Sequence, residues 1–532
     1  MSRVDIDAVV VGAGFAGMYT LHRLLQDNFK VRSFEAGDDV GGTWYWNRYP
    51  GARCDVQSME YSYTFDDDLQ QAWEWTERYA PQPEILSYAN HVADRYELRP
   101  HITFGTRVVS AHYNEESSFW ILSTDGGETL TSQFLIMATG CLSSMNTPDF
   151  KGIDSFKGET YHTGQWPQEG VDFTGKRVGV IGTGSSGIQS IPIIAEEADH
   201  LTVFQRTANF SVPAHNQLLD EEFIEDIKAT YPEFRANNRQ MMAGFGSRNE
   251  RHEDSVLDAD ETLIQERLEA NWQRGGLGFL GAFGDIVIKK EANASVAEFV
   301  RNKIREQVVD PKVAELLCPD QVIGCKRLCV DTNYYKTFNR DDVSLVDVKE
   351  HPIDEITEKG VVTNGKEYQF DAIVFATGYD AMTGSLLKVD IRGRKGQTLQ
   401  DKWAAGPRTY LGLSTYGFPN MFTISGPGSP SVLTNMIVSI EQHVNWIRDC
   451  LMYMRSNQHQ AIEAELDAED YWVVLANDIA GQTLFKSCNS WYLGANVPGK
   501  PRVFMPFIGG LPTYAEICDD VAQDNYRGFT VE

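Results

Sequence analysis

Two segments of the chain share one pattern of apolar and polar positions: a short apolar run, a glycine-rich turn, a stretch with helical periodicity, and a second apolar run. The first segment spans residues 6–35 and the second spans residues 176–207. An unbroken apolar run of five or six residues that ends at a glycine is typical of a buried strand in a parallel sheet. A strand, a tight glycine turn and a helix begin a dinucleotide-binding fold. The pattern therefore predicts two Rossmann-like folds in one chain.

The first glycine turn contains Gly12, Gly14 and Gly17, and Glu35 stands at the end of the second strand. Glycines at this spacing let backbone N–H groups approach a pyrophosphate at the N-terminus of the helix. An acidic residue at this strand end accepts hydrogen bonds from ribose hydroxyls and repels a 2′-phosphate. This first site therefore suits FAD or NAD rather than NADP.

The second glycine turn contains Gly182, Gly184 and Gly187, and Arg206 occupies the place that Glu35 has in the first copy. A cation followed by a hydroxyl suits a 2′-phosphate, so the second site favours NADPH over NADH and leaves FAD to the first. Around this turn the residues predicted to contact the cofactor also include Ser185, Ser186, Gln189 and Thr207.

Two further apolar runs resemble each other: residues 134–140 read FLIMATG and residues 372–378 read AIVFATG. Each run follows one glycine turn, and each ends in small residues that allow close approach of a cofactor. We expect Ala376, Thr377 and Gly378 to lie against NADPH.

Residues 216 to about 320 carry apolar residues at helical spacing among many charges. This stretch is predicted to be a helical insertion in the second nucleotide fold. The expected class is α/β, with two Rossmann-like dinucleotide-binding domains, for FAD and NADPH, and a helical insertion in the NADPH domain. The predicted boundaries are 1–150 and 385–532 for the FAD domain, 151–215 and 326–384 for the NADPH domain, and 216–325 for the insertion.

Composition excludes several classes of protein. The chain has 532 residues, of which 42 % are hydrophobic and 23 % charged, as in ordinary globular proteins. No run of eighteen apolar residues occurs, and Met1 leads through charged residues into a strand, which predicts a cytoplasmic protein with no membrane span. The formal charge of −28 argues against nucleic acid as a partner.

The eight cysteines are scattered along the chain. Only Cys325 and Cys329 lie close in sequence, and their spacing is neither that of a CxxC redox pair nor that of a zinc site. We expect all eight to be reduced, packed thiols, and we expect no metal.

A glycine-rich loop at residues 41–63 holds six aromatic residues. Such a loop either caps a core or covers a flat ligand, and the residues alone leave both interpretations open.

The stretch between the two nucleotide folds contains Phe156, Gly158, His162, Trp166 and Pro167. These residues resemble the fingerprint of the Baeyer–Villiger monooxygenases, and the resemblance covers almost the whole chain. Within that family the chain is most similar to enzymes that act on phenylacetone, and next to those that act on cyclohexanone. The resemblance implies that NADPH and O2 are used, through a C4a-peroxyflavin, to insert oxygen next to a ketone carbonyl and form an ester or lactone.

The resemblance also assigns roles to individual residues. It implies that Arg327 is the catalytic cation and that Asp55 orients it. It places Thr43, Trp44, Asp55 and Tyr61 at the flavin, and Lys326 and Trp491 at NADPH, with Trp491 on a mobile loop near the C-terminus. It places Cys141, Leu142, Ser431, Val432 and Met436 at the ketone pocket. We expect His162 to hold a loop or transmit a domain movement rather than to transfer protons.

Three other functions compete with this interpretation. Flavin-containing monooxygenases that oxidise nitrogen or sulfur share the glycine pairs, but their shorter motif lacks the ending Trp166-Pro167. Disulfide reductases need two cysteines beside the flavin, whereas Cys54 and Cys141 are far apart in sequence. A nucleotide sensor without activity has no use for the implied Arg327, Asp55 and Trp491. The ketone and its class stay open, and the expected state is a monomer or a weak homo-oligomer.

Overall fold

The computed structural model describes residues 4–532, so Met1, on which part of the location prediction rests, lies outside the described residues. The first nucleotide fold has the predicted order: β1 (Ile6–Val11), α1 (Phe15–Gln26) and β2 (Val31–Phe34). β1 pairs in parallel with β2 and with β6 (Thr129–Met137). These strands belong to an eight-stranded sheet of order β17-β4-β5-β6-β1-β2-β3, with β18 paired to β6. Its other strands are β3 (Ile102–Thr103), β4 (Val108–Asn114), β5 (Phe119–Thr124), β17 (Asp390–Arg392) and β18 (Met421–Thr423).

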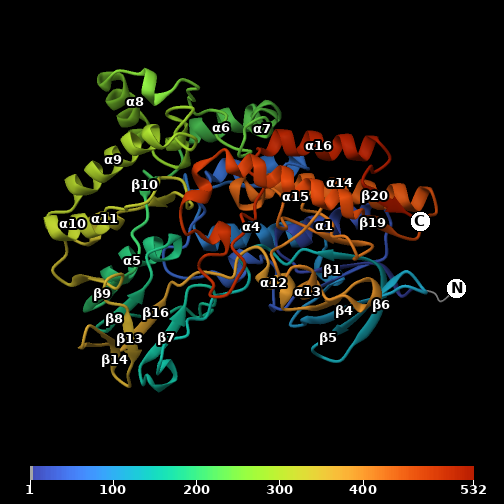
Figure 1. Cartoon of the computed structure of the whole chain (residues 1–532), viewed down its shortest axis with the longest axis horizontal. Helices are drawn as coiled ribbons and strands as arrows, with labels where there is room; N and C mark the ends of the chain where they lie inside the picture. Colours follow the sequence, from blue (N-terminus) through green and yellow to red (C-terminus); the bar gives the residue numbers. More distant parts are fainter. Residues whose placement is uncertain (1–3) are drawn as a thin grey trace.

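The C-terminal part of the chain returns to this first sheet. Helix α14 (Met436–Ser456) begins at Asn435, whose side chain accepts a hydrogen bond from the Ile437 N–H, and it packs along α1. Tyr19 of α1 donates a hydrogen bond to Asn445 of α14 at 2.9 Å. Figure 1 shows α14, α15 (Leu466–Gly481) and α16 (Leu511–Gln523) together on one side of the molecule, above the first sheet.

The second sheet has five parallel strands in the order β12-β9-β8-β16-β7. They are β7 (Glu159–His162), β8 (Arg177–Ile181), β9 (His200–Gln205), β12 (Val343–Asp347) and β16 (Ala372–Phe375), and α5 (Ser185–Glu197) follows β8. The connector between the two folds is therefore partly a strand: β7 pairs with β16 at the edge of the sheet, with His162 opposite Phe375. The two sheets lie beside each other in Figure 1.

The helices predicted within residues 216–325 are present. They are α6 (Glu221–Ala229), α7 (Tyr231–Arg239), α8 (Glu261–Arg274), α9 (Lys290–Gln307) and α10 (Pro311–Leu317). The short parallel pair β10 (Ser211–Pro213) and β11 (Cys329–Asp331) joins the two ends of this helical part. The α/β class with two nucleotide-binding sheets and inserted helices is confirmed; the second sheet is all parallel, and the first also contains the antiparallel pairs β4–β5 and β5–β6. The exact domain boundaries stay a prediction.

The remaining elements are short. Three antiparallel strands, β13 (Ile353–Ile356), β14 (Gly360–Thr363) and β15 (Lys366–Gln369), form a small sheet, and β19 (Ile462–Ala464) pairs with β20 (Phe529–Val531). The other helices are α2 (Thr43–Trp46), α3 (Asp67–Ala72), α4 (Gln82–Arg95), α11 (Tyr334–Thr337), α12 (Gly384–Leu387) and α13 (Leu399–Lys402). Across residues 4–532, no helix has both the length and the apolar character needed to cross a membrane.

The prediction that all eight cysteines are reduced is wrong for two of them. Cys325 and Cys488 form a disulfide with their Cα atoms 6.1 Å apart, and their sequence separation is 163. The other six cysteines are free. Sequence spacing could not reveal this pair, because only the fold brings the two segments together.

Candidate active site

A cavity of about 1860 Å³ lies where the carboxyl ends of the parallel strands of the two sheets face each other. Ligands of open α/β sheets bind at this end of the strands, where the loops leave the sheet. The cavity is lined by all the residues predicted for cofactor, catalysis and substrate except Gly17, Gly187 and Ser431. The residues predicted from the sequence therefore gather around one cavity. Their individual roles stay predictions.

The first glycine turn is built by close backbone packing. Gly12 has a φ of +109°, and a Cβ there would lie 2.5 Å from the carbonyl oxygen of Ala138; a Cβ on Gly17 would lie 1.9 Å from that of Gly12. Beside this turn the buried carboxylate of Glu35 accepts hydrogen bonds from the N–H groups of Ala13 and Gly37, both at 2.8 Å. The acid is thus held in one orientation at the edge of the cavity.

The second turn repeats this geometry with one informative difference. A Cβ on Gly182 would lie 2.4 Å from the Ala376 carbonyl oxygen, and a Cβ on Gly187 would lie 2.4 Å from that of Gly182. Gly184 has an ordinary φ of −81°, and a Cβ there would meet no protein atom within 4 Å. Neither packing nor backbone strain requires glycine at position 184, so its bare backbone facing the cavity fits a closely bound pyrophosphate.

Two cations stand beside the second turn. Arg206 follows β9 and is exposed, and Lys326 is half-buried. Within residues 4–532 neither makes an ion pair at 4 Å or less, unlike most arginines and lysines of this acidic chain. Burial lowers the pKa of Lys326, and the neighbouring charge of Arg206 lowers it further. Two like charges left close together at a cavity form a site for an anion.

Arg327 is fixed from two directions. Its Nε and Nη2 donate to the two carboxylate oxygens of Asp55, each at 2.7 Å, and its Nη1 donates to the carbonyl oxygen of Val432. Burial acts to lower the pKa of Arg327, but the charge of Asp55 and the hydrogen bonds to it outweigh burial and raise that pKa above its ordinary value. The guanidinium is therefore charged at any physiological pH and held in one plane.

The predicted ketone-pocket residues divide into two groups. Cys141, Leu142, Val432 and Met436 line the cavity and belong to one apolar cluster with Trp491. Ser431 does not line it: its hydroxyl donates to the Ser425 carbonyl at 3.0 Å, and its φ of +44° places it in a tight turn. Ser431 shapes the loop that presents Val432, and its predicted place at the ketone pocket stays a prediction.

The fingerprint residues lie outside the main cavity. The Nδ1 of His162 accepts from the Gly164 N–H at 2.9 Å, and its Nε2 lies 3.1 Å from the hydroxyl of Thr377. Burial lowers the pKa of His162, which favours the neutral ring. Thr377 in turn donates to the Asn146 carbonyl at 2.9 Å. His162 thus links the edge strand β7 to the small-residue turn that lines the cavity.

The other fingerprint residues pack around the connector that contains His162. Trp166 is buried and packs on Tyr161 and Phe173. A Cβ on Gly158 would lie 2.5 Å from the Asp371 carbonyl oxygen. Phe156 packs against the apolar cluster under the three-stranded sheet, and Pro167 borders a second, smaller pocket.

Three cavity residues were missed by the sequence analysis. Tyr49 donates to the side-chain oxygen of Gln189 at 2.8 Å and so joins the aromatic loop to the second turn. Tyr379 follows the second ATG, and Asn496 of the C-terminal loop donates to the Tyr379 carbonyl at 2.7 Å. The position of Tyr379 directly after a cofactor turn was a usable signal, whereas nothing in the sequence marked Asn496.

Comparisons with known proteins agree with this geometry. A sequence profile described as flavin-binding monooxygenase-like matches residues 6–215. A Baeyer–Villiger monooxygenase from Pseudooceanicola batsensis is 45 % identical over 98 % of this chain and 95 % of that protein. The chain belongs to the Baeyer–Villiger monooxygenase family. The predicted greater likeness to phenylacetone enzymes stays a prediction.

Solved structures of this family superpose along the whole chain. An oxidised steroid monooxygenase bound to NADP is 51 % identical, with a TM-score of 0.94 and 99 % of each chain covered. OTEMO in complex with FAD and NADP is 42 % identical, with a TM-score of 0.96 and 100 % of each chain covered.

One relative carries a different activity in its name. Phenazine N-monooxygenase PhzNO1 from Lysobacter antibioticus is 40 % identical over 99 % of this chain and 97 % of that protein.

Proposed function

We propose that this Baeyer–Villiger enzyme uses NADPH and O2 to insert oxygen next to the carbonyl of an apolar ketone, giving an ester or lactone. The observation that carries the proposal is the half-buried, permanently charged Arg327, which Asp55 holds at a cavity that both glycine turns line. The cofactors are FAD and NADPH, and when bound they supply the reducing equivalents and the oxygen-transfer chemistry.

The two cofactor sites follow from the residues at each turn. Glu35, whose carboxylate two backbone N–H groups orient, accepts hydrogen bonds from the ribose hydroxyls of FAD. Arg206 and Lys326 hold the 2′-phosphate of NADPH, and Thr207 offers a hydroxyl beside them. Gly184 leaves its backbone open to the NADPH pyrophosphate.

Arg327 acts on the reacting ketone. Negative charge develops on the carbonyl oxygen when a nucleophile adds to it, and a fixed cation in a site with little water stabilises that charge. Arg327 cannot serve as a proton donor at working pH, so its contribution is electrostatic. Asp55 positions the guanidinium, and the apolar cluster with Val432 and Trp491 excludes water from the reaction.

The pocket favours ketones with apolar substituents. Cys141, Leu142, Val432 and Met436 offer no charged group to a substrate. Aryl and open-chain ketones are our first candidates, and the likeness to a steroid monooxygenase adds bulky cyclic ketones to the classes worth testing. N-oxidation is the second candidate function, since a relative of similar identity is named for it.

The test is NADPH-dependent O2 uptake with product analysis. The purified holoenzyme would be offered phenylacetone, cyclohexanone, a long-chain 2-ketone, a steroid ketone, a thioether and phenazine. We expect an ester or lactone from at least one ketone, and we expect Arg327→Ala to slow its formation by about 10²–10³-fold while NADPH still reduces the flavin.

The matched control is Arg177→Ala. Arg177 forms a bidentate contact with Asp371, like that of Arg327 with Asp55, but on the exposed side of the second sheet. Ester formation in this control should equal that of the wild type. Oxidation of phenazine or the thioether alone, with no ketone product and no effect of Arg327→Ala, would replace the proposal by heteroatom oxidation.

A further inference from the structure

Residues 488–500, here called the strap, run along the rim of the cavity. Trp491, Ala495, Asn496 and Pro498 of the strap line the cavity. Its C-terminal end is tied down by polar contacts: Asn496 donates to Tyr379 at 2.7 Å and accepts from Asn146 at 3.1 Å. The last of its residues, Lys500, forms an ion pair with Asp380 and donates to the Ala381 carbonyl at 2.6 Å.

The other end of the strap is held differently. The backbone hydrogen bonds of the described residues 488–495 join the strap to itself, apart from one that the Tyr492 carbonyl accepts from Met505 at 2.9 Å. The side chain of Asn489 accepts from Arg502, which follows closely in sequence. The covalent link from this end to the NADPH side of the cavity is the disulfide between Cys488 and Cys325, and Tyr492, which lies beside Arg327, adds a noncovalent one.

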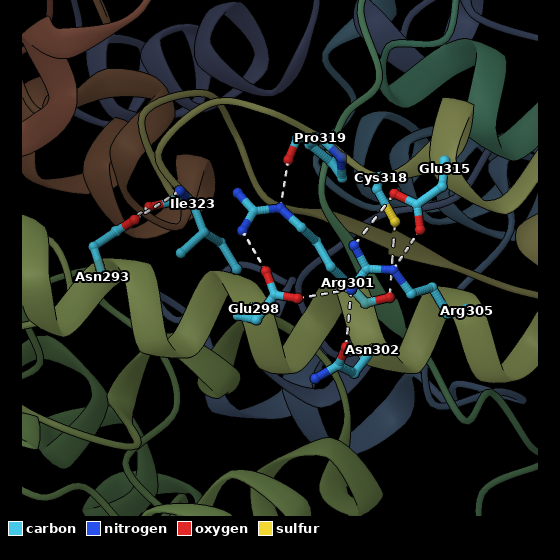
Figure 2. Close-up of polar contacts among 9 residues, drawn as sticks. All are labelled: Asn293, Glu298, Arg301, Asn302, Arg305, Glu315, Cys318, Pro319 and Ile323. Atoms are coloured by element: carbon cyan, nitrogen blue, oxygen red, sulfur yellow. Dashed lines mark hydrogen bonds and ion pairs between the residues drawn. The ribbon is translucent and has the colours of Figure 1, made fainter.

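Cys325 stands on a rigid support. Figure 2 shows how helix α9 holds the segment that leads to it: the side-chain amide of Asn293 accepts from the Ile323 N–H at 3.1 Å and donates to the Ile323 carbonyl at 2.9 Å. Two turns further along the helix, Arg301 donates to the Pro319 carbonyl at 2.7 Å and to the Glu298 carboxylate at 2.9 Å. The disulfide therefore connects the strap to a segment that α9 holds in place.

The position of the disulfide couples it to the two cations of the site. Cys325 directly precedes Lys326 and Arg327, and Cys488 lies three residues before Trp491. Cys325 is 1 % exposed, whereas Cys488 is half-buried and lines the cavity. Cys488 is therefore the cysteine of the pair that we expect a small thiol to attack.

We propose that the Cys325–Cys488 pair is a thiol–disulfide switch that sets how firmly the strap, and with it Trp491, closes over the nicotinamide dinucleotide. The identity of that dinucleotide rests on the proposed function. In the disulfide form both ends of the strap are attached, and NADP⁺ stays bound. In the dithiol form the Trp491 end is attached only by noncovalent contacts, namely packing and its hydrogen bonds with Met505 and Arg502, and NADP⁺ leaves sooner.

The switching chemistry is ordinary thiol–disulfide exchange. The thiolate of a low-molecular-weight thiol attacks Cys488 Sγ, forms a mixed disulfide there, and releases Cys325 as the leaving thiolate, which takes a proton. A second small thiol then attacks the mixed disulfide, which frees the Cys488 thiol and one small-molecule disulfide. Two electrons pass from the small thiols to the protein, and the same steps run backwards when a small disulfide is in excess.

The experiment compares the FAD-loaded enzyme before and after treatment with dithiothreitol. Three readouts are taken: peptide mapping without reduction, the dissociation rate of NADP⁺ by stopped flow, and limited proteolysis of the strap. We expect a linked Cys325–Cys488 peptide in the untreated enzyme, and after reduction about tenfold faster NADP⁺ dissociation with new cleavage within residues 488–495.

Two variants complete the design. Cys488→Ser should release NADP⁺ quickly and no longer respond to dithiothreitol, and its half-buried position makes the change easy for the fold to accept. The control Cys318→Ser removes a free thiol whose Sγ donates to the Arg301 carbonyl at 3.8 Å, and this variant should keep the full response.

Absence of the linked peptide would overturn the proposal, as would equal NADP⁺ dissociation and cleavage before and after reduction, or a reductant response that persists in Cys488→Ser. Peptide mapping and proteolysis do not depend on turnover. If the enzyme oxidised no ketone, these two readouts would still decide whether the strap is controlled by the disulfide.

Discussion

Arg327 and Asp55 are 272 residues apart in sequence, yet two parallel hydrogen bonds of 2.7 Å join the guanidinium to the carboxylate. Asp55 belongs to the aromatic loop of the first fold, and Arg327 lies two residues before β11. The third contact of the guanidinium, to the carbonyl of Val432, comes from the loop before α14. Three segments distant in sequence thus set the direction of one cation, so small changes in any of them will move it.

Asp55→Asn tests how strongly the rate of ester formation depends on the orientation of Arg327. The variant keeps the size of the side chain but removes its charge and one of its two acceptors, so Arg327 stays charged and loses its fixed plane. We expect the rate of ester formation to fall by about 10²-fold, with flavin reduction by NADPH changed much less. The measurement is single-turnover kinetics of each half-reaction. Asp371→Asn breaks the equivalent exposed contact to Arg177 and should leave both rates unchanged; an unaltered oxygenation rate in Asp55→Asn would contradict the role.

Gly184→Ala separates cofactor binding from folding. The added methyl group meets no protein atom within 4 Å, and the φ of −81° suits alanine. We expect a protein that folds and binds FAD normally, yet binds NADPH at least tenfold more weakly, because the methyl occupies the space where backbone and pyrophosphate meet. Titration with NADPH gives the affinity, and thermal unfolding gives the stability.

The comparison variant is Gly182→Ala. Here the φ is +114° and the added methyl would lie 2.4 Å from the Ala376 carbonyl oxygen. This change should lower stability by at least about 1–2 kcal/mol. Equal NADPH affinity in Gly184→Ala and the wild type would show that the turn does not hold the cofactor.

The sequence predicted the parts of this molecule that are encoded locally. Each glycine turn lies between an apolar strand and a helix, and the role of Gly12 or Gly182 depends on neighbours that the fold always supplies. The edge strand β7 was described only as a connector, because its first two residues, Glu159 and Thr160, are exposed and break the apolar pattern of a buried strand. A strand that borders solvent carries a weak signal in sequence.

The site depends on contacts between distant segments, and there sequence reasoning was weaker. Two adjacent cations such as Lys326 and Arg327 are usually ordinary surface residues. Only the resemblance to the family assigned them a role in the site. Nothing in the sequence paired Cys325 with Cys488, because their distance in space follows from the packing of α9 and the strap. Ser431 was expected in the pocket, and its turn points the hydroxyl to Ser425, so that expectation stays a prediction.

Arg206→Ala should change the choice of nicotinamide cofactor. Removing a cation that contacts a 2′-phosphate costs about 1.5–3 kcal/mol, or about 10–100-fold in NADPH affinity. The affinity for NADH should hardly change, since NADH has no phosphate at that position. The ratio of kcat/KM for NADPH to that for NADH measures the effect. Arg340→Ala serves as the control, because Arg340 pairs with Asp342 at the opposite, amino-terminal edge of the same sheet and does not line the cavity. A parallel loss with both cofactors would point to misfolding instead.

His443 should make the protein sensitive to acid. It is fully buried in α14, its Nδ1 accepts from the Ser425 N–H at 3.1 Å, and burial lowers its pKa from 6.5 to about 3. The unfolded chain binds a proton here below pH 6.5 and the folded chain does not, so the contribution of this group to stability is complete above pH 6.5 and is lost as the pH falls from there toward 3. At pH 5 the expected loss is about 2 kcal/mol.

His443→Asn keeps an acceptor for the Ser425 N–H but cannot titrate. We expect the free energy of unfolding of this variant, measured with urea at pH 7 and pH 5, to fall by about 2 kcal/mol less than that of the wild type. The comparison cancels the contributions of His22, whose pKa burial also lowers, to about 4. A half-exposed histidine, His101, provides the control: His101→Gln should lose as much stability between the two pH values as the wild type. Equal losses in wild type and His443→Asn would mean that His443 takes up its proton without unfolding the protein.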